Sequence, residues 1–427
     1  MTLDRKQAPP ARPIRHIDFL KAETTTLSNG TPIHIIHAGK QAVIGLELIF
    51  RRGGVRHENT NGASFFAMKM LSEGTRTKNS DTISHTIDQH GAYLQLSPGL
   101  DFSSADLYML TRHMHPLMQM LRELVTSSIF PEEELQKLKD IQQQQLRVSK
   151  QKPNVLASRA TKAGLFGMSH PYGKSLEEAD IDAISRQALI DFFKRNLSGD
   201  IELVVSGDVN TEVMQALETY FGDLPSENTS LDDDLLPDTI RSSERRIVIE
   251  KPDNLQSSVR LALPLFTKRH PDIHKVRILN TILGGYFGSR LMRNIREEKG
   301  LTYGINSGLI TLQDAGYFIV GTEVSKDKAA QVLDEIYKEV THLQEVAVPA
   351  TELITVKNYM AGRLLSSVDT PFALAEKFKN VHLYGLTYDF YKNYLDTINS
   401  ISAEEIQQVA KKHLDVSSMQ EVIVGTI

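Results

Sequence analysis

The feature of this sequence that most constrains its fold is an order of predicted strands and helices that occurs twice. In each half, two strands precede two helices, a hairpin and further helices. A polar, acidic and turn-rich stretch, residues 224–245, separates the halves. A period of roughly 210 residues is too long for a solenoid, so the repetition predicts two domains of one fold that arose by duplication.

Hydrophobic periodicity and turn residues place these elements along the chain. In the first half they predict a hairpin at 25–38, a strand at 42–54, helices at 62–75 and 80–92, a hairpin at 93–110, helices at 115–128, 131–151 and 185–197, and a strand at 200–209. In the second half they predict strands at 245–252 and 256–265, helices at 274–285 and 289–301, a hairpin at 302–324, a helix at 326–340 and two long closing helices.

The predicted fold class is α+β, with helices on one face of an antiparallel-rich sheet in each domain. The domains are expected at residues 25–223 and 246–427, joined by the linker 224–245. Residues 1–24 are rich in proline and basic side chains, which predicts an extended N-terminal arm.

Composition excludes several classes of function. The 427 residues carry a net charge of −5, with acidic and basic side chains mixed throughout, which argues against a nucleic-acid partner. The absence of cysteine excludes disulfides, thiolate zinc sites, iron–sulfur clusters and a cysteine nucleophile. The N-terminus lacks the apolar core of a secretory signal, and no apolar run reaches about 18 residues. We therefore expect a cytoplasmic protein with no membrane partner.

The predicted helix GASFFAMKMLSEGT, residues 62–75, is built like an active-site helix but carries no side chain suited to bind a metal or transfer a proton. Phe65, Met68 and Lys69 lie at helical spacing. None of these side chains is a ligand that zinc prefers, and none is an ordinary general base.

Several stretches of the chain together resemble the pitrilysin/insulinase family of zinc peptidases, in its short-chain branch of the mitochondrial processing peptidase type. They are the helix at 62–75, SHPYGK, LVVSGDV, ILNTILGGYFGSRLMRNIREEKGLTYGINS and AGYFIVGTEV. The resemblance covers the chain from about Glu23 to its end. It implies two α/β-roll domains with the LuxS/peptidase-like metalloenzyme fold. It also implies that two chains close into a chamber holding an unfolded peptide.

The resemblance implies that this chain has lost its zinc site. In active members the first helix carries HxxEH, whose two histidines bind zinc while the glutamate acts as base. These positions fall on Phe65, Met68 and Lys69, and the distal glutamate ligand falls on Gln145. The acidic neighbour of that ligand falls on Leu138. A shift of one residue restores no acid, because residues 141–146 read IQQQQL. We expect no metal or other cofactor in this chain, and zinc in a partner.

A second element of the family is retained. Arg296 and Tyr303 match an arginine and a tyrosine, seven residues apart, that bind the substrate near the scissile carbonyl. A guanidinium fork and a phenol suit a developing oxyanion. Gly284, Gly285 and Gly288 match the glycine loop of the chamber. The plain alternatives are a surface arginine with a packing tyrosine, and a simple helix stop.

The histidines offer no convincing alternative metal site. His113 and His115 are two residues apart and do not share a helix face. His85 and His90 flank a helix end, and His170 lies in the SHPYGK turn. We interpret all five as structural or solvent-facing.

Three functions remain open at this stage. The first is the non-zinc subunit of a heterodimeric metallopeptidase, in which Arg296 and Tyr303 act in trans on peptide held at the zinc of an HxxEH-bearing partner. The second is a non-catalytic peptide-binding or scaffold homodimer. The third is a self-sufficient zinc endopeptidase, which residues 65–69 oppose. Unfolded peptides are the expected substrates.

Overall fold

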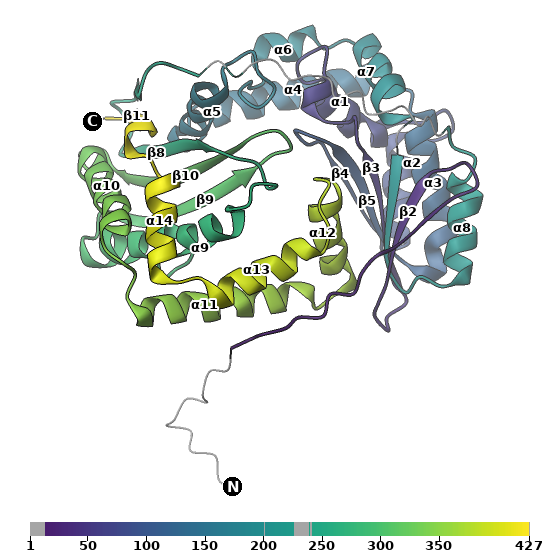
Figure 1. Ribbon diagram of the computed structural model, residues 1–427. Coiled ribbons are helices and arrows are strands. Elements are labelled where there is room, and N and C mark those ends of the chain that lie inside the picture. The colour runs from purple at the N-terminus through teal and green to yellow at the C-terminus, as the bar shows by residue number, and fades with distance from the viewer. Residues whose placement is uncertain (1–12, 200, 226–238, 240, 427) are drawn as a thin grey trace.

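The computed structural model describes residues 13–199, 201–225, 239 and 241–426. Within them the chain forms two β-sheets, each covered by helices, that lie on opposite sides of the molecule (Figure 1). Most of the predicted linker (226–238 and 240) and half of the predicted arm (1–12) lie outside the described residues.

The first sheet has the strand order β1-β2-β6-β3-β5-β4. Its strands are β1 (Glu23–Thr26), β2 (Pro32–His37), β3 (Val43–Phe50), β4 (Tyr93–Ser97), β5 (Ser103–Leu110) and β6 (Ile201–Gly207). β2 and β6 run parallel, and the other neighbours are antiparallel. The predicted Asn29-Gly30 hairpin joins β1 to β2, where Gly30 takes the positive φ that such a turn requires.

The second sheet has the order β7-β11-β8-β10-β9. Its strands are β7 (Arg246–Glu250), β8 (Gln256–Leu265), β9 (Thr302–Thr311), β10 (Gly316–Ser325) and β11 (Gln420–Gly425). Leaving β1 aside, both sheets place their strands in the order first, fifth, second, fourth, third. In both, only the first and fifth strands pair in parallel. This shared topology agrees with the repetition in the sequence.

The helices were predicted in part. Those of the first half are α1 (Ala63–Met70), α2 (Ser80–Gln89), α3 (Met114–Ser127), α4 (Glu132–Ser149), α5 (Pro153–Phe166), α6 (Glu178–Ala183), α7 (Arg186–Phe192) and α8 (Thr211–Phe221). Those of the second half are α9 (Ile273–Gly284), α10 (Ala329–Glu345), α11 (Ala350–Leu365), α12 (Pro371–His382), α13 (Asp389–Ser400) and α14 (Ala403–His413). A π-helical stretch, Met292–Glu298, follows α9.

The sequence missed α5, α6 and α8. Its prediction that two long helices close the chain is wrong, because four helices and the strand β11 lie there. Pro371 interrupts the apolar periodicity at the first residue of α12 and separates it from α11.

Each half contributes one helix that packs on the sheet of the other half. The first sheet buries one face under helices of its own half, including α1, α3 and α8. Its opposite face packs against α12 of the second half, where Leu374 and Phe378 meet Ile36 and Val204. Reciprocally, α5 of the first half lies on the second sheet, with Ala157 against Val422 and Val424 of β11. Figure 1 shows both helices beside the sheet of the other half.

Buried charges accompany this exchange. The ammonium of Lys379 on α12 pairs with Glu47, which β3 holds almost wholly buried. Burial raises the pKa of Glu47 to about 7, although Lys379 acts in the opposite direction. A buried charge without its partner is costly, so this pair fixes α12 on the first sheet.

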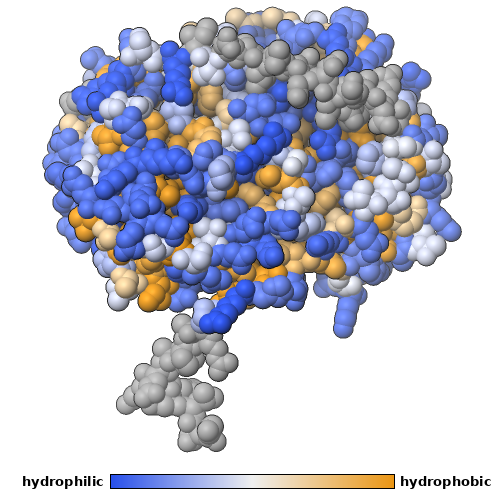
Figure 2. All heavy atoms as spheres, in the orientation of Figure 1, coloured by the Kyte–Doolittle hydropathy of each residue, from blue (hydrophilic) through white to orange (hydrophobic). Residues whose placement is uncertain are grey.

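The face in Figure 2 is largely hydrophilic, with hydrophobic residues scattered between the polar ones. Among the described residues, no helix combines the length and the apolar character needed to cross a bilayer.

Candidate functional site

Helix α1 begins at a charged cap. The backbone N–H groups of Gly62 and Ser64 donate to the carboxylate of Glu58, at 3.0 and 2.8 Å. Gly62 precedes the helix with a φ of 90°, a conformation that favours glycine. Burial raises the pKa of Glu58 even though these bonds favour the carboxylate. The cap starts the helix at Ala63 and so sets which side chains face the core.

Of the three positions that the resemblance matches to the family's catalytic groups, the helix buries one fully and two partly. Met68 is fully buried in the core of the first half. Phe65 packs at the edge of that core, with its ring edge-on to Phe66 at a centroid distance of 5.3 Å. Both side chains therefore serve packing. Lys69 is half-buried, and its Nζ donates to the backbone oxygen of Leu96 at 3.0 Å.

Helix α4 lies beside α1 and supplies the second part of the former site. Leu138 and Lys69 line one depression of ≈ 500 Å³, together with Glu73 and Leu94. Gln145 is exposed two turns further along α4. Burial, and then the neighbouring Glu134, raise the pKa of Glu73. The depression offers the ammonium of Lys69 and the carboxyl groups of Glu73 and Asp81, and its lining includes neither a histidine nor Gln145, so it does not provide the family's zinc ligand set.

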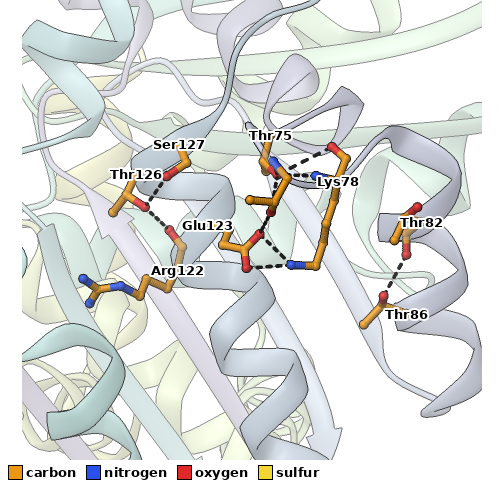
Figure 3. Close-up of polar contacts among 9 residues, drawn as sticks. Thr75, Lys78, Thr82, Thr86, Arg122, Glu123, Thr126 and Ser127 are labelled. Carbon is orange, nitrogen blue, oxygen red and sulfur yellow. Dashed lines mark hydrogen bonds and ion pairs between the residues drawn. The ribbon is translucent and has the colours of Figure 1, made fainter.

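A polar cluster holds the segment that follows α1 against α3 (Figure 3). Glu123 on α3 accepts from Nζ of Lys78 at 2.6 Å and from the hydroxyl of Thr77 at 2.6 Å. Thr75 closes the turn by accepting from the backbone N–H of Lys78. Burial opposes ionisation of Glu123, but the bonds from Lys78 and Thr77 outweigh it and lower its pKa. This cluster fixes the loop that follows α1.

The structure brings Arg296 and Tyr303 together at the edge of the second sheet. Nε of Arg296, in the π-helical stretch, donates to the backbone oxygen of Tyr303 at 3.1 Å. Tyr303 lies on the edge strand β9, and its side chain is 93% exposed. The guanidinium also lies 4.8 Å from the ring centre of Phe287, which is 65% exposed. The half-buried cation of Arg296 thus lies beside an exposed aromatic ring and 3.7 Å from a carboxylate oxygen of Glu297, while the phenol of Tyr303 stands in solvent.

The glycines before this pair allow close packing. Gly284 ends α9, and a Cβ there would lie 2.7 Å from the backbone nitrogen of Ser307 on β9. At Gly285 an added Cβ would lie 2.7 Å from Cα of Thr281. A Cβ at Gly288 would meet the ring of Tyr286 at 2.9 Å. Gly284 therefore sets the distance between α9 and β9, which positions Tyr303.

Four of the five histidines considered from the sequence contact other residues, and the fifth, His85, is exposed. His170 is buried and accepts from the backbone N–H of Tyr172 at 3.0 Å, a turn-forming contact. Nδ1 of His90 lies 2.7 Å from the backbone oxygen of Thr86, and its ring contacts that of His113. His115 contacts Tyr220, and His85 is exposed on α2. These positions fit the structural interpretation.

Sequence reasoning missed two other groups of possible ligands. Within the described residues, His34, Glu202 and His382 form one group, and His270, Asp272 and His413 form another. Neither contains a residue of α1 or α4. Each combines segments far apart in the chain, so no local spacing could reveal it.

Two family models match the chain. Residues 38–178 match the model described as insulinase (peptidase family M16), and residues 183–360 match the model described as peptidase M16 inactive domain.

Curated relatives and solved structures extend the match over nearly the whole chain. An uncharacterized zinc protease, YmxG of Bacillus subtilis (strain 168), is 22% identical over 84% of this chain and 88% of the relative. The non-peptidase homolog YmxG of Helicobacter pylori (strain ATCC 700392 / 26695) is 24% identical over 89% of this chain and 88% of its own length. The crystal structure of a peptidase M16 inactive domain from Pseudomonas fluorescens superposes with a TM-score of 0.84 at 23% identity. That superposition covers 96% of this chain and 99% of the other.

Proposed function

The chain belongs to the insulinase family of peptidases (family M16), as a member without the HxxEH residues. From this premise we propose that it is the non-zinc subunit of a two-chain metallopeptidase. Arg296 and Tyr303 then bind the backbone of an unfolded peptide whose scissile bond lies at the zinc of an HxxEH-bearing partner. The partner supplies the metal and the general base, and this chain supplies hydrogen-bond donors.

The exposure of Tyr303 is the observation that carries the proposal. A tyrosine retained for packing buries its ring, whereas this ring is 93% exposed on an edge strand. Arg296 is fixed by its bond to the Tyr303 backbone and by Phe287, so its guanidinium is oriented before any ligand arrives. Donors oriented in advance stabilise a developing oxyanion without reorganisation.

The residues of α1 explain why the metal has to come from another chain. Lys69 places an ammonium at a position where the family has a ligand, and two positive charges about 4 Å apart repel strongly in a poorly solvated site. Phe65 and Met68 are occupied in packing. A self-sufficient zinc peptidase is therefore the least supported of the three candidate functions.

The test is peptidase activity of the chain co-purified with a family member that carries HxxEH. Arg296→Ala and Tyr303→Phe should each lower kcat/KM, by about 10²-fold where one oxyanion donor is lost. Arg293→Ala and Tyr93→Phe are matched controls, because both side chains are exposed and lie outside the proposed pair. Full activity of both test variants would overturn the proposed role in trans.

A second candidate is a peptide-binding or scaffold homodimer without catalysis. The name of the Helicobacter pylori relative, a non-peptidase homolog, favours this alternative. It predicts that the chain binds unfolded peptide and cuts none, either alone or with an HxxEH chain. Cleavage that depends on both chains excludes it.

A further inference from the structure

We propose that His34, Glu202 and His382 form a binding site for a divalent transition-metal ion of the Zn²⁺ class, which fastens α12 to the first sheet. The ligands come from β2, β6 and the last residue of α12. The site is separate from the position of the family's HxxEH motif, and the inference does not depend on the proposed peptidase role.

The three donor atoms converge. Nε2 of His382 lies 2.8 Å from Oε2 of Glu202, and Nε2 of His34 lies 3.5 Å from the same oxygen. Zinc–ligand bonds near 2.0–2.1 Å in a tetrahedron place neighbouring ligand atoms about 3.3 Å apart, between the two observed distances. Two imidazoles and one carboxylate are ligands that zinc accepts, with a fourth position left for water.

His34 carries the second observation. Its side chain is only 3% exposed, and the polar contact of Nε2 is the long one to Oε2 of Glu202, at 3.5 Å. The hydroxyl of Thr24 lies 2.9 Å from the other ring nitrogen, Nδ1. When Nδ1–H donates to that hydroxyl, the lone pair is left on Nε2, which points at the carboxylate. A hydrogen bond to the distal ring nitrogen is the usual way in which proteins orient a metal-binding histidine.

Arg51 is a cation beside the proposed ion, but unlike Lys69 it does not take a ligand position, and the carboxylate of Glu202 already neutralises it. Its Nε donates to Oε1 of Glu202, whereas both histidines face Oε2. Its Nη2 also lies 3.1 Å from Nε2 of His382. A metal bound to that nitrogen replaces this one contact, and the guanidinium keeps its bond to the outer carboxylate oxygen; such a hydrogen bond to a metal-binding carboxylate is common in proteins.

The experiment measures zinc bound by the full chain after EDTA treatment and dialysis. Equilibrium dialysis with Zn²⁺ and elemental analysis should give one tightly bound ion per chain. His34→Gln and His382→Gln should each lose that ion. Thr24→Ala, a change on an exposed strand, should weaken binding about tenfold, because the ring of His34 is no longer held.

His413→Gln is the matched control, because it removes a histidine from the other candidate group. It should retain the ion. Circular dichroism establishes that each variant is folded, and Co²⁺ in place of zinc should show the visible bands of a four-coordinate site in the unaltered chain. The proposal is overturned if the unaltered chain binds no zinc, or if the His34 and His382 variants bind as much as the unaltered chain.

Discussion

At the scale of single residues, Lys69 and its neighbour Met68 show that α1 contributes to packing at positions where the resemblance places zinc-site residues. The ammonium of Lys69 is satisfied by the backbone oxygen of Leu96, while Met68 beside it is fully buried. The position of the family's general base now belongs to the hydrophobic core. Substitutions that introduce zinc ligands on α1 would therefore change the stability of the chain as well as its ligands.

Met68→Glu should lower the free energy of unfolding by about 3 kcal/mol, because it places a carboxylate in a core without a partner. Lys69→Gln on the same helix should change it by about 1 kcal/mol or less, since only one exchangeable hydrogen bond is lost. Urea unfolding at neutral pH compares the two variants. Equal effects would contradict the packing role assigned to Met68.

His274 should make the protein less stable in mild acid. It is 7% exposed, among the rings of Phe390 and Tyr394, and burial together with Arg277 lowers its pKa to about 4. The unfolded chain binds a proton near pH 6.5, whereas the folded chain does not. Stability is therefore fully present above pH 6.5 and falls between pH 6.5 and 4, by up to about 3 kcal/mol.

The measurement is the free energy of unfolding at pH 7.5 and pH 5 for the unaltered chain and for His274→Phe. The difference between the two pH values should be smaller in the variant, because phenylalanine fills the site and takes up no proton. His16→Gln, at an exposed position, is the control. An unchanged difference in His274→Phe would show that other groups cause the acid sensitivity.

At the scale of elements, the contact between α9 and β9 determines the second part of the candidate site. Gly284 permits the close approach, and the same strand then presents Tyr303. The sequence predicted this glycine as part of a chamber loop. The structure assigns it a packing role that also positions the exposed pair.

Gly284→Ala should destabilise the chain by about 1–3 kcal/mol, because the new Cβ would lie 2.7 Å from backbone of β9. Gly362→Ala is a matched control within a helix, where an added Cβ meets no atom within 4 Å. That change should stabilise the chain by about 0.5–1 kcal/mol through helix propensity. Thermal unfolding should show a lower melting temperature for Gly284→Ala and a higher one for Gly362→Ala than for the unaltered chain.

Local sequence patterns predicted the elements that carry clear turn, stop or periodicity signals, and missed α5, α6 and α8, of which α6 and α8 pack in their own half. The Asn29-Gly30 hairpin and the helix that Gly91 ends follow from turn and stop signals, and both are present. α5 was missed because its apolar residues, such as Ala157, face a strand that lies more than 250 positions later in the chain. Arg296 and Tyr303 were found by a resemblance. His34 and His382 come together only because α12 packs on the first sheet, so no local sequence pattern predicts that they are close.

At the scale of the whole molecule, the exchange of α5 and α12 predicts that the halves stay together without a covalent link. A protease site introduced within residues 226–238 and then cut should leave two fragments that co-elute in size-exclusion chromatography. Apolar contacts and the Lys379–Glu47 pair hold them. Phe378→Asp should weaken their association in the cut chain. Fragments of the cut, unaltered chain that separate in native buffer would contradict the prediction.

The same exchange has a consequence for how a peptide could enter a chamber. Rotation of one sheet away from the other would break the apolar contacts of α12 and separate Glu47 from Lys379. We therefore expect the two halves of the chain to move together as one rigid body. If the chain closes on a second chain as proposed, an entrance for an extended peptide would lie between the two chains.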